Sequence, residues 1–224
     1  VVTTKHNGDT LSTGRSRYMS RDLISYLLNN VQEDIASTYG FRWPVRGILD
    51  RSYSESREPF VPSVIFESLS HQNFTDMLYG HDPCFKFVIA RSVYKSLLKH
   101  ISYVHGRKYV VQPLPVTHFS ISLSDDKGTA SLKWRPSHDP LEPTAKPKRY
   151  VVYKRENGGG YDNGTVVDSP HYSVEVEKNV QYSFKVAALN EGGESMPSEE
   201  LSLFVAKKSK GTVLVVNGFY RLSA

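Results

Sequence analysis

YSFKVAALN at residues 182–190, followed by the turn sequence GGESMPSE at residues 192–199, decides the fold of the second half of the chain. Apolar residues in alternation indicate a half-buried β-strand, and the glycines and proline that follow indicate a turn. Three similar runs lie upstream, at residues 130–134, 150–153 and 172–176. Strands of this kind, separated by turn signals at intervals of about eight to twelve residues, predict an antiparallel β-sandwich.

The first half of the chain has the periodicity of helices. Apolar residues spaced by one, three and four positions predict an amphipathic helix from Ser20 to about Ser37, with Ser20 as its cap. A second helix is indicated by Asp82 followed by Pro83, a capping residue and then proline at the first helical position. We expect this helix to end near Gly106.

Between the two predicted helices lies the apolar run VPSVIF at residues 61–66. Its β-branched composition predicts a strand buried on both faces. The order of strand and helices indicates part of an α/β domain. Glu67 then stands at the carboxyl end of the buried strand, where open α/β sheets place their sites. From the pattern alone, the favoured interpretation of this glutamate is a solvated residue at the tip of a strand.

The change from helical to strand periodicity predicts the domain boundaries. We expect an α/β domain over residues 1–112, a β-sandwich over 113–206 and the first strand of a further, truncated domain over 207–224. The last of these begins with a basic patch at residues 207–211 and continues with the apolar run TVLVVN at 212–217.

Composition excludes several classes of protein. With 39% hydrophobic and 23% charged residues, the 224-residue chain is globular rather than disordered. The formal net charge is +5, but the arginines are scattered without aromatic interleaving, so we do not expect a nucleic-acid partner. No apolar run is long enough for a membrane span, and we expect any export signal to lie outside this sequence. The single cysteine, Cys84, excludes an internal disulfide, and we expect it to be a buried small side chain.

The second half resembles a fibronectin type III domain over about residues 113–206. The resemblance rests on Trp134 in an early strand, on the strand at residues 182–190 and on the turn after it. It implies an immunoglobulin-like sandwich in which Tyr182 is the corner tyrosine, with a hydroxyl bonded to nearby backbone. We interpret Trp134 and Tyr182 as packing residues rather than a ligand platform. This fold by itself implies no function.

The first half is similar to the closing half of zinc-dependent N-acetylmuramoyl-L-alanine amidases. The similarity rests on VPSVIFESLSHQN at residues 61–73, on Asp76 and on the helix that begins at Asp82-Pro83. In that family a buried strand ends in a catalytic glutamate, and a Ser-Asn turn, an acidic segment and a long final helix follow. Glu67 matches the catalytic glutamate. The turn departs from the family, which usually has Gly-Phe where this chain has residues 69–73.

The resemblance implies a fold, a cofactor and a substrate. It implies the C-terminal half of an amidase-like α/β domain whose zinc ion is held by two histidines and one glutamate. These ligands are expected upstream of residue 1, so no metal ligand is assigned in this chain. His6 is interpreted as a surface histidine rather than a ligand. The implied substrate is peptidoglycan, cut at the amide between N-acetylmuramic acid and the L-alanine of the stem peptide.

Other polar residues near Glu67 have two interpretations each. His71 and Asn73 either orient Glu67 by supporting the loop or contact substrate, or they belong to a turn held by its own side-chain hydrogen bonds. The arginines at 46, 51 and 57 either bind a stem-peptide carboxylate or form local ion pairs in solvent, and we favour the second interpretation.

The resemblance to the amidases implies a fragment of a peptidoglycan hydrolase that is periplasmic, secreted or part of the cell envelope. We expect the fragment to be inactive alone, since it lacks the implied zinc ligands. One alternative is a non-catalytic binding or spacer module of the cell envelope. Another is an accessory part of a polysaccharide-degrading enzyme whose activity lies in a domain beyond Ala224.

Overall fold

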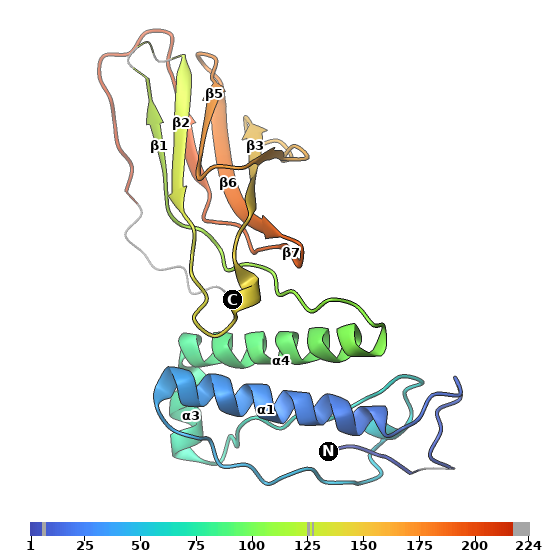
Figure 1. The fold of residues 1–224 in the computed structure, drawn as a ribbon. Coiled ribbons are helices and arrows are strands. Elements are labelled where there is room, and N and C mark those ends of the chain that lie inside the picture. Colours follow the sequence, from blue (N-terminus) through green and yellow to red (C-terminus); the bar gives the residue numbers. More distant parts are fainter. Residues whose placement is uncertain (6–7, 125, 127, 217–224) are drawn as a thin grey trace. The chain divides into compact units, whose positions relative to one another are not determined.

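The chain forms two compact units that divide between Tyr109 and Val110, close to the boundary expected at residue 112. A computed structural model describes residues 1–5, 8–124, 126 and 128–216. One unit is helical and the other is built from strands, and each has its own apolar core (Figure 1).

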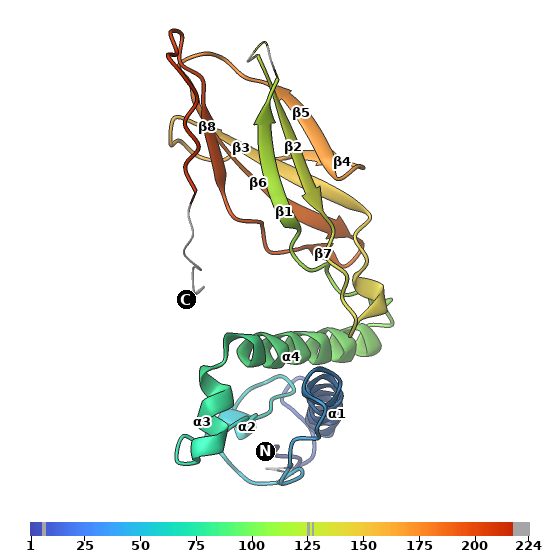
Figure 2. The same cartoon turned by 90° about the vertical axis from the view of Figure 1, so that its left-hand side faces the viewer.

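The first unit contains helices at both predicted places. The elements are α1 (Met19–Tyr39), α2 (Ser54–Arg57), α3 (Phe74–His81) and α4 (Pro83–Val104). The long helices α1 and α4 lie side by side, as Figures 1 and 2 both show. Helix α4 begins as predicted, because the Asp82 carboxylate accepts a hydrogen bond of 2.9 Å from the Cys84 backbone N–H.

The predicted cap of the first helix is wrong. The N-cap position of α1 is Tyr18, which provides no side-chain hydrogen bond, and Ser20 lies inside the helix. The Ser20 hydroxyl instead accepts a hydrogen bond of 3.0 Å from the backbone N–H of Ser63. Ser20 therefore ties the helix to the segment that leads to Glu67.

The segment at residues 61–66 is not the buried strand that its composition predicts. It has no strand assignment, Val61 is 62% exposed and the remaining residues are half-buried. Within the described part of the chain, its only backbone-to-backbone pairing is at Ile65, which exchanges two hydrogen bonds of 2.7 and 2.9 Å with Val1. A ladder needs such bonds along several residues, so this single pair does not make a sheet.

The described part of the first unit is therefore a helical region, and a parallel sheet of the α/β type is not present there. Backbone pairing in this unit is confined to isolated contacts such as the parallel bridge between Val2 and Asp50. Val2 donates to the Leu49 carbonyl and accepts from the Arg51 N–H, both at 2.9 Å. An apolar run alone was a poor guide because it cannot specify a backbone partner.

The second unit is a β-sandwich of two antiparallel sheets (Figures 1 and 2). The smaller sheet has the order β1-β2-β5, with β1 (Thr117–Leu123), β2 (Thr129–Arg135) and β5 (His171–Glu175). The larger sheet contains β3 (Arg149–Glu156), β4 (Thr165–Val167), β6 (Gln181–Asn190), β7 (Gly193–Glu194) and β8 (Leu201–Phe204). A short 3₁₀ turn, η1 (Pro143–Ala145), precedes β3. The four strands predicted from the sequence correspond to β2, β3, β5 and β6.

Burial alternates along β2 as predicted, whereas β6 is buried over most of its length. Phe184 and Leu132 are fully buried, and Trp134 is 4% exposed with its ring 5.3 Å from that of Tyr150. The Tyr182 hydroxyl accepts a hydrogen bond of 3.2 Å from the Glu177 backbone N–H. The predicted packing roles of Trp134 and Tyr182 are therefore confirmed, including the hydroxyl contact of the corner tyrosine.

The strand predicted at residues 212–217 is not formed over 212–216, and Asn217 lies outside the described residues. Val213, Leu214 and Val215 are 87%, 83% and 87% exposed. No backbone among the described residues pairs with this run, and a strand is not stable without a partner. The further domain over 207–224 stays a prediction.

None of the helices in the described part of the chain combines the length and the hydropathy that a membrane span requires.

Candidate functional site

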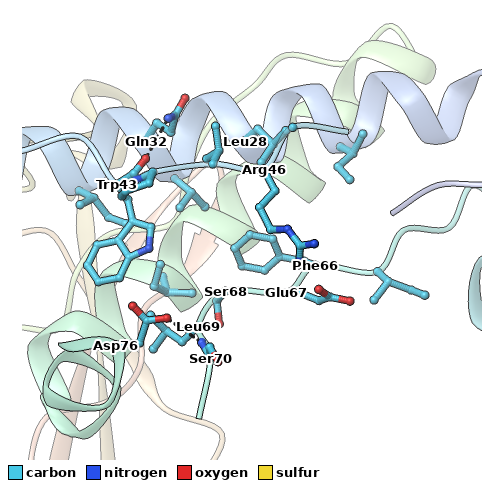
Figure 3. A pocket seen from close by; sticks show the side chains of 18 of the residues that line it. Leu28, Gln32, Trp43, Arg46, Phe66, Glu67, Ser68, Leu69, Ser70 and Asp76 are labelled. Atoms are coloured by element: carbon cyan, nitrogen blue, oxygen red, sulfur yellow. Dashed lines mark hydrogen bonds between the residues drawn. The ribbon is translucent and has the colours of Figure 1, made fainter. Parts of the chain in front are cut away.

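The helical unit contains a cavity of about 250 Å³ next to Glu67 (Figure 3). Its walls are mostly apolar and come from α1, from the segment before Glu67 and from the start of α4; they include Ile24, Leu28, Ile35, Ile65, Phe66 and Phe85. Polar side chains are contributed by Gln32, Arg46, Glu67 and Asp76. An apolar cavity with a few polar groups is the usual form of a site for a small ligand.

Glu67 lies at the mouth of this cavity, directly after Phe66 in its wall. Its side chain is exposed, so water reaches the carboxylate. The backbone before it is fixed at two points, by the bond from Ser63 to the Ser20 hydroxyl and by the pair between Ile65 and Val1. The segment thus positions Glu67 without the predicted strand.

Arg46 faces the same cavity from the loop that follows α1. In Figure 3 its side chain extends past the Phe66 ring toward Glu67. The loop is anchored because the Gln32 amide donates a hydrogen bond of 3.2 Å to the Trp43 carbonyl. The Trp43 ring also lies 5.1 Å from that of Tyr79, perpendicular to it. Arg46 is therefore held by a packed loop rather than a free one.

The other two arginines of this region have local partners, as the sequence analysis favoured. Arg57 forms an ion pair of 2.6 Å with Glu58 and also bonds to Ser52 at 3.0 Å. The Arg51 guanidinium donates to the Asp50 carbonyl at 3.4 Å. Neither of them lines the cavity, so the structure distinguishes Arg46 from the other two.

The loop after Glu67 is held by its own hydrogen bonds. The Asn73 side chain caps α3 by accepting a hydrogen bond of 3.2 Å from the Asp76 N–H. In return, the Asp76 carboxylate accepts one of 2.8 Å from the Ser70 N–H. These contacts assign Asn73 to the turn. A role for the exposed His71 in substrate contact stays a prediction, since neither His71 nor Asn73 lines the cavity.

Sequence reasoning missed several residues of the cavity and one nearby helix. Asn73 followed three residues later by Asp76 resembles a capping box, and this signal would have found α3. Gln32 and Trp43 carried no comparable signal. Their place in the site depends on the loop after α1 folding back against that helix.

The residues that the structure describes do not fit a zinc ion. Within residues 1–5, 8–124, 126 and 128–216, no three His, Cys, Asp or Glu side chains come together as metal ligands. Glu67 and Asp76 line one cavity, but no histidine joins them. His6 lies outside the described residues.

Cys84 is exposed, which corrects the prediction that it is buried. It occupies the first turn of α4, whose buried positions begin at Phe85 and continue at Val88 and Ser92. Cys84 is therefore on a different face of the helix from the core.

The comparisons with known proteins bear on the sandwich. Residues 114–204 match the family model of the fibronectin type III domain, so this part of the chain is such a domain. The twitchin kinase region from C. elegans is similar at 23% identity and a TM-score of 0.37, over 44% of this chain and 18% of that chain. Titin kinase with its flanking domains is similar at 20% identity and a TM-score of 0.36, over 43% of this chain and 18% of that chain. The chain thus spans a small part of the length of both. No curated protein matches the sequence.

Proposed function

We propose that the helical unit is the closing part of the catalytic domain of a cell-wall amidase, joined to a fibronectin type III domain. The observation that carries the proposal is the position of Glu67. The glutamate that matches the catalytic residue of the amidases is at the mouth of the cavity in this unit. The substrate of the parent protein is then peptidoglycan, and its location is the periplasm, the cell envelope or the exterior.

In this proposal Glu67 transfers a proton during hydrolysis of the amide. Its carboxylate accepts a proton from the attacking water as the bond from oxygen to the carbonyl carbon forms. It then gives the proton to the nitrogen of L-alanine as the carbon–nitrogen bond breaks, which leaves a carboxylic acid and a free amine; the acid then loses its proton to solvent. A general acid–base group of this kind contributes about a hundredfold to ten-thousandfold to the rate.

The resemblance also implies a zinc ion, with ligands that precede the amidase segment present here. Because the described residues offer no site for it, no step of the reaction is assigned to the metal in this chain. The proposal therefore concerns the parent protein, and this chain is expected to release no stem peptides alone.

The test is the substitution Glu67→Gln in the longest natural protein that contains this chain. It keeps the size of the side chain but removes its proton acceptor, so release of stem peptides from purified peptidoglycan should fall by about a hundredfold or more. The matched control is Glu55→Gln, at an exposed position on α2, which should leave the rate unchanged. Full activity of the Glu67→Gln protein in a chromatographic release assay would refute the proposal.

A second candidate is a non-catalytic binding or spacer module of the cell envelope. It is consistent with the fibronectin type III domain at residues 114–204, a fold that by itself implies no catalysis. It predicts that the longest natural protein contains no stoichiometric zinc, releases no stem peptides and still sediments with peptidoglycan sacculi. Metal analysis together with the release assay separates the two candidates.

A further inference from the structure

We propose that the cavity beside Glu67 binds the amino-terminal end of a short peptide that also carries a carboxylate. Arg46 binds the carboxylate, Glu67 binds the protonated amine, and the apolar walls enclose a small side chain. Only the choice of probe peptide rests on the proposed function; the chemistry of the ligand follows from the cavity.

The two charged groups are available to a ligand. Both line the same cavity, and among the described residues neither forms a hydrogen bond or an ion pair. Glu67 does have an electrostatic neighbour in the Val1 amino group, whose pKa burial lowers and the Glu67 carboxylate partly raises again. A guanidinium binds a carboxylate through two parallel hydrogen bonds, and a carboxylate binds an ammonium group. A positive and a negative group at one mouth complement a ligand that carries both charges.

The backbone near these groups is anchored before a ligand binds, whereas the two side chains themselves are exposed. The loop of Arg46 is anchored through Trp43, and the segment of Glu67 is anchored through Ser63 and Ile65. An anchored backbone loses little further conformational entropy on binding, so the entropic cost falls mainly on the two side chains.

The size and lining of the cavity limit the ligand to a small one. Its volume of about 250 Å³ lies just below the range of roughly 300–1,000 Å³ for sites that hold drug-sized molecules. Ile24, Leu28 and Ile65 give it apolar walls, which suit a methyl or similar side chain and not a hydroxyl-rich glycan. A peptide of about two residues meets both conditions.

The experiment uses the dipeptide L-alanyl-γ-D-glutamate, which has a free amine, a methyl side chain and carboxylates. It is titrated into the 224-residue chain by calorimetry, with the indole N–H signal of Trp43 in NMR spectra as a local reporter. The other tryptophan, Trp134, is buried in the sandwich and serves as the internal reference. We expect saturable binding that shifts the Trp43 signal and leaves that of Trp134 in place.

Substitution of Arg46 tests the carboxylate contact. Arg46→Ala should weaken binding about tenfold or more, because a hydrogen-bonded charge pair is lost. Arg42→Ala is the matched control, since Arg42 is exposed on the same loop and does not line the cavity. Arg46→Gln keeps a longer polar side chain than Arg46→Ala does, so it disturbs the loop less. It should weaken binding as well, because it also lacks the positive charge. Equal affinities of the Arg46 and Arg42 variants would overturn the proposal, as would a lack of saturable binding.

Acetylation of the dipeptide tests the amine contact. The acetylated peptide should bind the unmodified chain about tenfold more weakly than the free peptide does. The Glu67→Gln chain should bind both peptides with the same affinity, because it already lacks the carboxylate that contacts the amine. Independent, additive losses would overturn the assignment of the amine to Glu67.

The binding experiments test this inference independently of the proposed function, because they measure affinity and require no hydrolysis. Peptide binding that depends on Arg46, with no release of stem peptides by the longest natural protein, would refute the amidase proposal and leave this inference standing. Release of stem peptides by a protein whose peptide affinity is unchanged by Arg46→Ala would support the amidase proposal and refute this inference.

Discussion

The two units of the chain bury their interiors in different ways. The core cluster of the sandwich consists of apolar and aromatic side chains such as Leu132 and Phe184. Between α1 and α4, by contrast, Asp34 and Lys95 form a buried ion pair of 2.8 Å, with side chains 8% and 5% exposed. Ser92 also donates a short hydrogen bond to Asp34. The core cluster of the sandwich is apolar, whereas the contact between α1 and α4 combines an apolar cluster with specific polar partners.

Buried polar contacts recur along this helix pair. The Asn30 amide donates a hydrogen bond of 2.9 Å to Ser96, one turn of α4 beyond Ser92. A buried polar group costs free energy unless it is bonded, so each partner must stand opposite the other. These contacts therefore fix the register of α1 against α4 more strictly than apolar packing does.

The largest expected effect lies in the sandwich, with Phe184→Ala. Phe184 is fully buried between the sheets, so its removal leaves a cavity and should lower the free energy of unfolding of this unit by about 3–5 kcal/mol. Chemical denaturation of the full chain, followed by the fluorescence of Trp134, measures it. Phe204→Ala is the control, because Phe204 is 56% exposed and should cost under about 1 kcal/mol. Similar losses for the two variants would contradict the packing described for the sandwich.

A somewhat smaller effect is expected in the helical unit, with Lys95→Ala. This change leaves the Asp34 carboxylate buried without its cation and should destabilise the unit by about 3 kcal/mol. Loss of helical circular dichroism with denaturant measures it, and Lys86→Ala, at an exposed position of α4, is the control.

A double variant sharpens the contrast between the two interiors. Replacing both partners, as Asp34→Leu with Lys95→Met, should recover most of the stability, since apolar residues of similar volume often substitute for a buried ion pair. If the double variant stays as unstable as Lys95→Ala, the ion pair makes a net contribution to stability. The loss in the single variant would then not be only the penalty of an unpaired buried charge.

The smallest expected effect is a pH dependence confined to the helical unit. Burial lowers the pKa of His100 from its usual 6.5, while Asp22 partly opposes the shift. The unfolded chain then binds a proton more readily than the folded one, so this contribution to stability is complete above about pH 6.5 and declines as the pH falls toward the lowered pKa. His100→Gln should remove that decline. Parallel stability curves for both proteins between pH 7 and pH 5 would contradict the prediction.

The sequence predicted the elements with long, regular patterns. Helices α1 and α4 and strands β2, β3, β5 and β6 were found from their periodicity, and the corner role of Tyr182 followed from its place in the strand. Short or pattern-poor elements were missed, among them β4, β7 and α3, and so was β1, although its sequence has apolar residues in alternation. The apolar run at 61–66 was misread as a strand because periodicity registers burial but not the backbone partner that a strand needs.

The candidate site was predictable only in part. Glu67 was identified by resemblance, but the cavity beside it was not, since its other polar residues are far apart in the sequence and are brought together by the loop after α1. Local pattern also failed for Cys84 and Ser20, whose environments depend on which helix face is covered.

The amino-acid sequence by itself determined that this protein has a helical part and a sandwich, because apolar spacing sets which backbone conformation can bury a continuous face. Only the tertiary structure decided that Asp34 meets Lys95 and that Arg46 shares a cavity with Glu67. Such contacts depend on how distant segments pack, and the free energy of burying a polar group is fixed only when its partner is in place.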